Sequence, residues 1–437
     1  MPPADSPDTP TPAHPLTVSA ATPARRRDAI IVGAGLAGSS LAAALAQRGW
    51  DVLLVERDRL PRHKVCGEFL SPEAQHSLAR LGVLEAVAAL GPVPLHGAAL
   101  WMPGGRCVEM ALPAPAWGLS RHALDAALAA AAGHGGAEVW PETTVIGAAR
   151  EGGSAAVQVR RAGARAAARS EREPLTLHAA AVIFACGRHS AAALPPRDNR
   201  AGSVSDRSPL PHGRGSDRAE RQGWRRCAGL KRHYTGVTMP PRVELYLFPG
   251  GYVGINPVEG APGEGRANVC VLLTYAAFQS LGKSLDCVLE AAAARHPLLA
   301  ARLAGAQPVA GSECAVAPVD TERRPAPWDA VLDAPCLGDT AAMIPPLAGD
   351  GMAMALRSAE LCLERAPAYL AGSLSPADWA SAYTRAWRAE FAGRLRLGRA
   401  LQRGLTTPTL GDGLAAIGAA FPVLAQWMLA GTRGRMA

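Results

Sequence analysis

Three glycines near the start of the chain have the spacing of a phosphate-binding turn. Gly33, Gly35 and Gly38 fit the pattern G-x-G-x-x-G, between an apolar run over 29–32 and a helix expected over 36–47. The first glycine permits the tight turn, the second lets backbone approach a pyrophosphate, and the third lets the helix pack closely on the strand. The helix N-terminus then offers unpaired N–H groups and a positive dipole end to the phosphates.

A carboxylate follows at the distance that a dinucleotide site requires. A second apolar run over 52–55 ends in Glu56, roughly 20 residues beyond the glycines. A carboxylate at this place accepts hydrogen bonds from the ribose hydroxyls of adenosine. Glycine turns are common, so the glycines alone are weak evidence. With a strand before and after them and Glu56 in place, they predict a dinucleotide site.

A second polar turn lies far along the chain. An expected strand delivers Gly338 and Asp339, and a glycine turn at Gly349 and Gly351 then opens a helix expected to reach Glu364. A polyol chain buried in protein needs hydrogen-bond acceptors, and a carboxylate supplies strong ones. This stretch is therefore a second candidate for contact with the same ligand.

The run Cys66-Gly67-Glu68, followed by Ser71-Pro72, lies between these two turns in the sequence. It resembles the signature of the geranylgeranyl reductase-like flavoproteins. These belong to the para-hydroxybenzoate hydroxylase-fold superfamily, which also contains flavin monooxygenases and halogenases. The stretch from Gly338 to Gly351 is similar to the same family's Gly-Asp-Ala-Ala…Pro…Gly-x-Gly segment, with Thr340 and Ala342 as departures.

This resemblance implies an α/β fold with a Rossmann-like FAD-binding domain, an antiparallel β-sheet substrate domain and C-terminal helices. It implies FAD as the cofactor. The chain has one credible G-x-G-x-x-G pattern, which argues against a separate nicotinamide domain. We therefore expect NAD(P)H or another electron carrier to reduce the flavin as a transient donor.

The resemblance also suggests roles for individual residues. In the family a cysteine lies beside the flavin, which makes Cys66 the candidate catalytic residue; the alternative is a small buried hydrophobic side chain. Arg121 matches an arginine near the cofactor; the alternative is an ion pair at the start of a helix. The expected cofactor-binding residues are Gly33, Gly35, Gly38, Glu56, Arg57, Arg121, Gly338, Asp339, Pro346, Gly349 and Gly351.

Three functions remain open. The cysteine motif favours an FAD-dependent reductase of carbon–carbon double bonds in an isoprenoid, lipid or polyketide-type substrate. The wider superfamily favours a monooxygenase that hydroxylates an aromatic or polyketide substrate through a flavin hydroperoxide. Cys186-Gly187 stands where many hydroxylases have Asp-Gly, which weakens that alternative, and the halogenase signature W-x-W-x-I-P is missing. A non-catalytic flavin-binding protein is the third possibility.

The stretch from Gly229 to Leu273 alternates with a period of two and predicts four antiparallel strands. In the resembling family such a sheet covers the flavin and shapes the substrate cavity. Tyr246, Phe248 and Tyr252 are candidates for the cavity wall, and ordinary packing within the sheet is the alternative for each.

Composition bounds the remaining possibilities. Of the net charge of +8, a surplus of seven basic residues falls between Arg188 and Arg232. That segment is rich in Pro, Gly, Ser and Arg, so we expect a solvated insertion and no nucleic-acid partner. Nine dispersed cysteines without ligand spacing indicate a cytoplasmic protein without disulfides and without a metal site.

These patterns divide the chain into five parts. We expect a disordered leader over 1–24 and an FAD-binding domain over 25–190 and 313–372, with 92–117 joining the substrate sheet. We further expect a disordered basic insertion over 191–226, a substrate domain over 227–312 and C-terminal helices over 373–437.

An apolar stretch over 414–429 is too short to span a bilayer. We expect it to pack on the main body; the alternative is peripheral contact with the inner face of the membrane. The expected partner is a small hydrophobic substrate, and the oligomeric state is unknown.

The insertion gives a first prediction. Deleting residues 201–223 should leave the fold and the bound FAD intact, because a Pro/Gly/Ser-rich surface segment contributes no core. The measurement is the far-ultraviolet circular dichroism and visible absorbance of the purified deletion variant. Insoluble or colourless protein would place this segment in the core.

Overall fold

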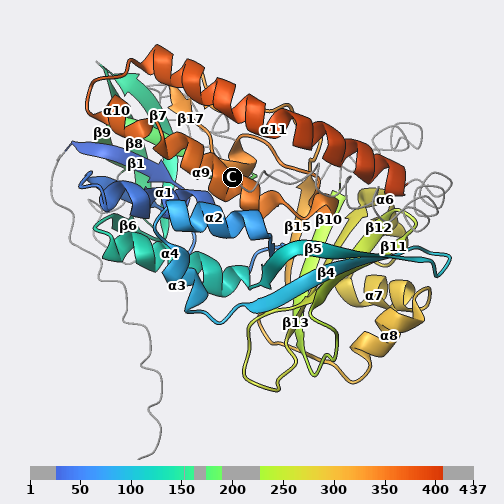
Figure 1. Ribbon diagram of the computed structural model, residues 1–437. Coiled ribbons are helices and arrows are strands. Elements are labelled where there is room, and N and C mark those ends of the chain that lie inside the picture. Colours follow the sequence, from blue (N-terminus) through green and yellow to red (C-terminus); the bar gives the residue numbers. More distant parts are fainter. Residues whose placement is uncertain (1–25, 152, 162–173, 189–226, 407–437) are drawn as a thin grey trace, which may run out of the picture.

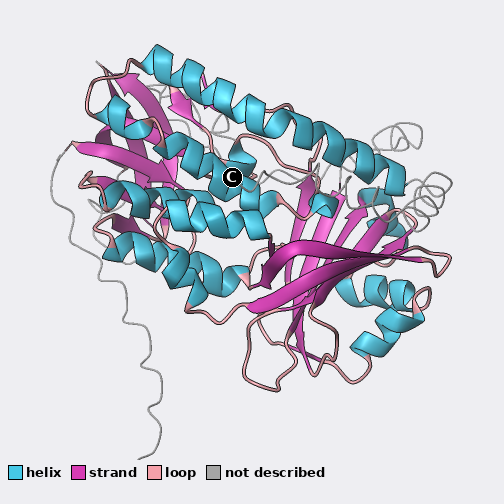
Figure 2. Ribbon diagram, in the orientation of Figure 1, coloured by secondary structure: helices cyan, strands magenta, loops and turns pink. Residues whose placement is uncertain are grey.

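The fold consists of two sheets with helices packed around them, in a computed structural model that describes residues 26–151, 153–161, 174–188 and 227–406. Figures 1 and 2 show the six-stranded sheet and its helices on one side and the larger sheet on the other. The predicted leader, the insertion over 191–226 and the stretch over 414–429 lie outside the described residues.

Among the described residues, six strands form the first sheet in the order β6-β2-β1-β9-β8-β7. The neighbours β6, β2, β1 and β9 are parallel, whereas β8 and β7 are antiparallel additions. Both faces of β1 are buried, which is typical of a parallel strand covered by helices. The strands are β1 (Arg27–Val32), β2 (Val52–Val55), β6 (Glu138–Trp140), β7 (Thr143–Glu151), β8 (Ser154–Arg161) and β9 (Leu175–Phe184).

Helices from distant parts of the sequence cover this sheet. Helix α1 follows the glycine turn and packs against α4 and α9 through buried alanine and leucine side chains. The helices of this part are α1 (Leu36–Ala46), α2 (Pro72–Arg80), α3 (Leu84–Ala88), α4 (Arg121–His134), α9 (Gly351–Leu363) and α10 (Ala366–Leu370).

The second sheet has the order β14-β10-β13-β12-β11-β4-β5-β3, and β15 pairs with β10 along the edge that β14 also uses. Its pairs are antiparallel except β4 with β11. The strands are β3 (Phe69–Leu70), β4 (Val93–Trp101), β5 (Cys107–Gly118), β10 (Cys227–Thr235), β11 (Arg242–Phe248), β12 (Gly251–Pro257), β13 (Ala267–Thr274), β14 (Gln307–Pro308) and β15 (Cys314–Val319).

One face of the second sheet packs against α7 and α8, where Tyr246 and Phe248 join the side chains of Val288 and Leu299. The other face lines the cavity described below. The strands predicted between Gly229 and Leu273 are therefore present as β10 to β13. The helices on this sheet are α6 (Tyr275–Ser280), α7 (Leu285–Ala293) and α8 (Pro297–Leu303).

The sheet also contains strands from both sides of the predicted substrate domain. Strands β4 and β5 come from the stretch over 92–117. Strand β15 lies beyond residue 313, where the FAD-binding domain was expected to resume, yet it pairs with β10. The chain returns to the first sheet through β16 (Trp328–Asp329), β17 (Ala334–Pro335) and the short helices η4 (Gly338–Thr340) and η5 (Pro346–Ala348).

Helix α11 (Pro376–Thr406) runs along the whole molecule, over both sheets (Figure 1). Ser375 caps its start, because the Ser375 hydroxyl accepts a hydrogen bond from the Asp378 N–H at 3.1 Å. Every fourth residue of one face is buried, which turns four aromatic side chains and one leucine toward α9 and β17: Trp379, Tyr383, Trp387, Phe391 and Leu395. Near its end the Arg399 guanidinium donates to the Thr321 carbonyl oxygen at 3.2 Å, just beyond β15.

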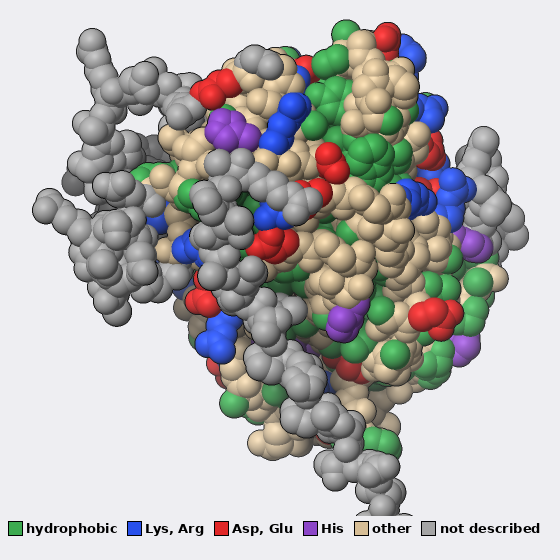
Figure 3. Space-filling view, turned by 90° about the vertical axis from the view of Figure 1, so that its left-hand side faces the viewer, with side chains coloured by type: hydrophobic (Ala, Val, Ile, Leu, Met, Phe, Trp, Pro, Cys, Tyr) green, Lys and Arg blue, Asp and Glu red, His purple; other side chains and the backbone are tan. Residues whose placement is uncertain are grey.

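The surface in Figure 3 shows basic and acidic side chains side by side on one face. This agrees with ion pairs such as Arg27 with Asp51 at 2.8 Å. Within the described ranges, no helix combines the length and the apolar character that a membrane crossing needs. The same residues contain no group of three or more His, Cys, Asp or Glu side chains arranged to hold a metal ion.

Candidate active site

A single large cavity brings the predicted site residues together. Its volume is about 850 Å³, and both sheets contribute to its wall. Of the predicted site residues, Gly38 lies outside the wall; the others line it: Gly33, Gly35, Glu56, Arg57, Cys66, Arg121, Gly338, Asp339, Pro346, Gly349 and Gly351. Residues more than 300 positions apart in the sequence thus meet at one site. Their roles toward a cofactor remain predictions.

The glycine turn has the geometry of a phosphate cradle. Gly33 has a φ of +107°, and a Cβ there would lie 2.4 Å from the Ala185 carbonyl oxygen. A Cβ at Gly38 would lie 1.9 Å from the Gly33 carbonyl oxygen, so helix α1 and the turn touch directly. At Gly35 the nearest atoms, on Arg121 and Lys64, would be 3.8 and 3.9 Å away. A side chain at Gly35 would therefore extend into the cavity without displacing protein.

The charges beside this turn suit an anionic ligand. The Arg121 guanidinium donates two hydrogen bonds of 2.8 Å to Asp125, and the Lys64 ammonium lies 2.6 Å from the same carboxylate. Burial opposes ionisation of Asp125, but Arg121 and Lys64 together hold its pKa below the usual value. Two cations and one carboxylate leave a net positive charge at the N-terminus of α1, as a pyrophosphate requires.

Glu56 is buried at the end of β2 with its carboxylate on the cavity wall. One oxygen accepts from the Ala34 N–H at 2.8 Å, and the other accepts from the Asp58 N–H at 3.0 Å. Each carboxylate oxygen can accept a further hydrogen bond. The side chain is thus fixed in place and can still receive ribose hydroxyl groups.

Asp339 lies half-buried in η4, and no described residue donates a hydrogen bond to its carboxylate. Burial raises its pKa, while Arg121, Arg323 and Arg188 oppose the shift. A desolvated carboxylate without a donor is costly unless a ligand supplies one. The hydroxyl groups of a ribityl chain would do so, and the cavity therefore fits FAD from the glycine cradle to Asp339. Helix α9 begins beside it at Gly351.

Cys66 lies on the loop over 62–69, which lines the cavity. Its sulfur accepts from the Glu68 N–H at 3.4 Å and contacts the Arg121 guanidinium. Burial raises the pKa of the Cys66 thiol, and the charge of Arg121 opposes this shift without cancelling it. The thiol is therefore protonated at neutral pH, and two donors stand ready to stabilise a thiolate.

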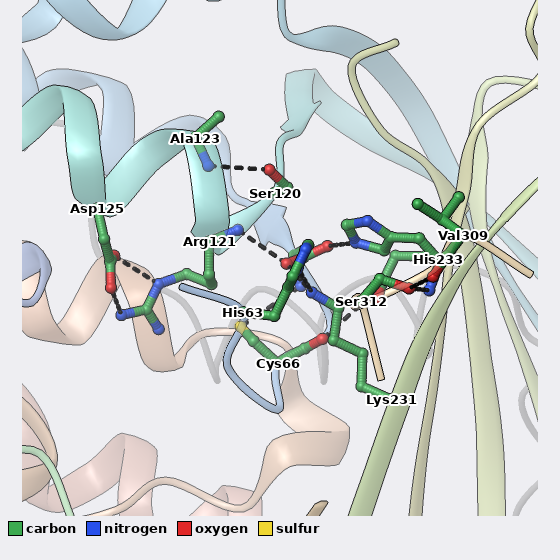
Figure 4. Close-up of polar contacts among 12 residues, drawn as sticks. His63, Cys66, Ser120, Arg121, Ala123, Asp125, Lys231, His233, Val309 and Ser312 are labelled. Atoms are coloured by element: carbon green, nitrogen blue, oxygen red, sulfur yellow. Dashed lines mark hydrogen bonds and ion pairs between the residues drawn. The ribbon is translucent and has the colours of Figure 1, made fainter. Parts of the chain in front are cut away.

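No role was predicted for the group of residues that fixes this loop. The Glu68 carboxylate, fully buried, accepts from the Lys231 ammonium, from His233 at 2.6 Å and from the backbone N–H of Arg121 at 2.8 Å. Burial opposes its ionisation, but His233 and Lys231 keep its pKa below the usual value. Figure 4 shows Arg121 of α4 and Lys231 and His233 of β10 pointing toward the loop that carries Cys66.

His63 completes this group. Its ring stacks on His122 with 4.5 Å between centroids, and it meets the edge of His233 at 5.0 Å. A signal for the cluster was present in the sequence: Lys231 and His233 are two residues apart in a predicted strand. Residues at that spacing point to the same face.

The far end of the cavity is apolar. Paired residues of adjacent strands share a face, so the strand register defines a row that crosses the sheet toward Lys231 and Cys314. Its other members are Val108, Leu100, Leu245, Gly254 and Cys270. Further apolar side chains extend this wall: Ala98, Met110, Val243, Val316, Val319, Met343, Leu347 and Leu401.

The same register decides which aromatic residues reach the cavity. Tyr252 pairs with Leu247 and lines the wall, whereas Tyr246 and Phe248 lie on the opposite face against α7 and α8. For these two residues, packing within the sheet was the correct alternative. Cys186 also lines the wall, and burial raises the pKa of its thiol to about 12.

Residues 26–195 match a family model described as an FAD binding domain. Over 384 residues the chain is 28% identical to digeranylgeranylglycerophospholipid reductase 2 of Methanopyrus kandleri, and the alignment covers 83% of each protein. It is 36% identical over 127 residues to menaquinone reductase of Mycolicibacterium smegmatis. It is 42% identical over 77 residues to squalene monooxygenase SE2 of Panax ginseng.

These last two alignments cover 28% and 18% of this chain, and 30% and 14% of the length of the relatives. Solved structures share the fold. A geranylgeranyl bacteriochlorophyll reductase-like protein from Thermoplasma acidophilum has a TM-score of 0.66 at 22% identity, covering 90% of this chain and 91% of that one. The myxobacterial halogenase CndH has a TM-score of 0.66 at 20% identity, covering 83% and 79%.

The domain match identifies the chain as an FAD-binding protein, and its fold is one that flavin-dependent enzymes share. The predicted FAD cofactor and α/β fold are confirmed. The predicted resemblance to the geranylgeranyl reductase-like flavoproteins is confirmed as well.

The glycine cradle gives the second prediction. Gly35→Val should lower FAD affinity by at least about a hundredfold, because the new side chain occupies the space of the pyrophosphate. The fold should survive, since no protein atom lies within 3.8 Å of the added Cβ. The measurements are the amount of FAD that stays bound to the purified variant and the temperature at which the variant unfolds.

Gly393→Val is the matched control, because Gly393 is exposed on α11 and a Cβ there meets no atom within 4 Å. A yellow Gly35→Val protein with the parent's affinity would show that the pyrophosphate lies elsewhere.

Proposed function

We propose that this protein reduces carbon–carbon double bonds of an apolar, isoprenoid or lipid-type substrate. The observation that carries the proposal is the apolar row across the nine-stranded sheet, which meets the wall carrying Cys66. Beyond Lys231, the described members of the row carry no charge: Cys270, Gly254, Leu245, Leu100 and Val108. A neutral chain gains free energy from burial there, about 25 cal/mol per Å² of apolar surface.

FAD, when bound, supplies the hydride that one carbon of the double bond receives. A proton must reach the other carbon, and we assign it to the Cys66 thiol. Burial keeps this thiol protonated at neutral pH. The thiolate left behind is stabilised by the Arg121 guanidinium and the Glu68 N–H, so the acid is fixed in place before the reaction.

The remaining residues of the wall would bind the cofactor and the substrate and would exclude water. Lys64, Arg121 and Glu56 would hold the dinucleotide, while the apolar row would orient the chain and keep water from the double bond. A reduced nicotinamide dinucleotide or another electron carrier would restore the reduced cofactor between turnovers.

A monooxygenase is the second candidate. The match to a squalene monooxygenase favours it, because the name of that relative also gives an apolar substrate. The two candidates differ in their need for oxygen and in the product mass. A reductase works without oxygen and adds two hydrogen atoms, whereas a monooxygenase needs oxygen and adds one oxygen atom.

The third prediction separates them. Dithionite-reduced protein, incubated without oxygen with digeranylgeranylglycerophospholipid, menaquinone or squalene, should add two hydrogen atoms to at least one of these probes. Mass spectrometry of the extracted products is the measurement. Products that form only in air and carry an additional oxygen would establish the monooxygenase instead.

Cys66 gives the fourth prediction. Cys66→Ser should keep FAD bound and still be reduced by dithionite, but turnover of the alkene should fall by about a hundredfold, the usual contribution of a placed general acid. Because only the protonated thiol donates, parent turnover should be constant near neutral pH and fall as the pH rises through the raised thiol pKa, above 9.0. The serine variant should lack this alkaline decrease.

Cys287→Ser on α7 is the control, because this cysteine is exposed and is not among the residues that line the cavity. Equal turnover in the parent and in Cys66→Ser would show that the Cys66 side chain serves packing alone.

A further inference from the structure

Among the described strands, two glycines line the cavity, and their surroundings differ. At Gly229 on β10, a Cβ would lie 2.8 Å from Val65 Cγ1 and 3.1 Å from Val316 Cγ1, so the missing side chain makes room for the protein itself. At Gly254 on β12, the nearest atoms would be the flexible end of Leu245 at 3.2 Å and a backbone carbonyl oxygen at 3.7 Å. No other described atom would lie within 4 Å of that Cβ.

The backbone of β12 does not require glycine at this position either. Gly254 has no positive φ, and it pairs regularly with Cys270 and Leu245 in the two neighbouring strands. A glycine inside a strand weakens the strand and often marks a place where a ligand approaches the backbone closely. Gly254 is half-buried and lines the cavity. The space above it is therefore open to a ligand.

The neighbours of Gly254 on the same face of β12 are larger and buried. Side chains two residues apart in a strand share a face, so Tyr252 and Asn256 flank Gly254, and both line the cavity. The Asn256 amide donates to the Glu68 carbonyl oxygen at 3.4 Å, so the loop over 62–69 covers that side. The ring of Tyr252 occupies the other side. Gly254 is thus the low point at which a ligand can cross β12.

The loop places Cys66 beside β13, one strand away from Gly254. The Asn268 amide of β13 donates to the Cys66 carbonyl oxygen at 3.0 Å. Asn268 lies two residues before Cys270, which is the partner of Gly254 in the sheet. Burial raises the pKa of the Cys270 thiol, and the nearby Cys66 thiol raises it further. On the far side of Gly254 the row continues with Leu245, so a chain that begins at Cys66 reaches the apolar wall by crossing Gly254.

We propose that Gly254 is a specificity-determining residue, which lets a long isoprenoid-type chain lie across β12 while its reacting double bond lies near Cys66. The inference rests on the proposed function for the apolar character of the substrate, and it adds which substrates fit. From Cys270 to Leu100 the row crosses three strand spacings, about 14 Å. A chain that continues well beyond its reacting double bond fills this distance, whereas a short alkene does not.

A side chain at residue 254 would stand in this path. Valine is favoured in strands, so Gly254→Val should keep the sheet intact. The end of Leu245 needs to shift by only a few tenths of an ångström to admit the new Cβ. The two methyl groups of valine would then narrow the passage over β12, and the single methyl group of Gly254→Ala would narrow it less.

The test measures binding without turnover. Phytanol, a fully saturated isoprenoid alcohol, and isoamyl alcohol, its counterpart with a single isoprene unit, are titrated into FAD-loaded protein, and the visible absorbance of the flavin reports binding. Gly254→Val should retain FAD and weaken phytanol binding by about tenfold or more, while its affinity for isoamyl alcohol stays within about threefold of the parent.

Two further variants complete the comparison. Gly393→Val makes the same change at an exposed glycine of α11, where a Cβ meets no atom within 4 Å, and should bind phytanol as the parent does. Gly254→Ala should weaken phytanol binding by a smaller factor than Gly254→Val. It decides the question if the valine variant does not fold, because an unchanged affinity for phytanol would then count against the path over Gly254.

Four outcomes would overturn the inference. The first is a Gly254→Val protein with the parent's affinity for phytanol, and the second is an equal loss for both alcohols, which indicates a distorted wall. The third is loss of FAD at an unchanged unfolding temperature, which would place the flavin over Gly254. The fourth is a parent protein that does not bind phytanol. If the parent binds phytanol selectively through Gly254 but reduces none of the alkene probes, the proposed reduction fails and the path over Gly254 stands.

Discussion

The Glu68 carboxylate is the point on which the cavity depends. It is buried where its own loop meets two other elements: the start of α4, which supplies the Arg121 N–H, and strand β10, which supplies Lys231 and His233. The backbone of Glu68 also has a φ of +53°. A residue other than glycine adopts this left-handed conformation only when its surroundings impose it. Removing one member of a buried ion pair typically costs about 3–5 kcal/mol. This one interaction therefore joins the FAD-binding half to the nine-stranded sheet and fixes the loop of Cys66 between them.

From that point the polarity of the cavity changes along one row of the sheet. Lys231 lies at the charged end, and Cys270, Gly254, Leu245 and Leu100 follow strand by strand toward the apolar end. Because paired residues share a face, the strand register determines the order of polar and apolar side chains along this row. The Lys231 cation is held away from the apolar side chains by its pairing with Glu68.

The glycine turn, Glu56 and the turn from Gly338 to Gly351 could be predicted because each is a local pattern whose spacing is set by the chemistry of the ligand. The elements around them were predicted for the same reason. The contacts of Glu68 could not be predicted in this way, since Lys231 and His233 lie 163 and 165 residues further along the chain. The faces of Tyr246 and Phe248 also depend on strand register, which alternation alone does not fix. Nor did the sequence show that β15 would extend the sheet beyond residue 313.

The hairpin of β4 and β5 supplies the apolar wall but none of the predicted cofactor contacts. Ala98 and Met110 face each other across it, and exchanging their sizes changes the length and width of the chamber alone. Under the proposed function, a few substitutions in this one hairpin would change the length of chain that the protein accepts and would leave the predicted cofactor contacts unchanged.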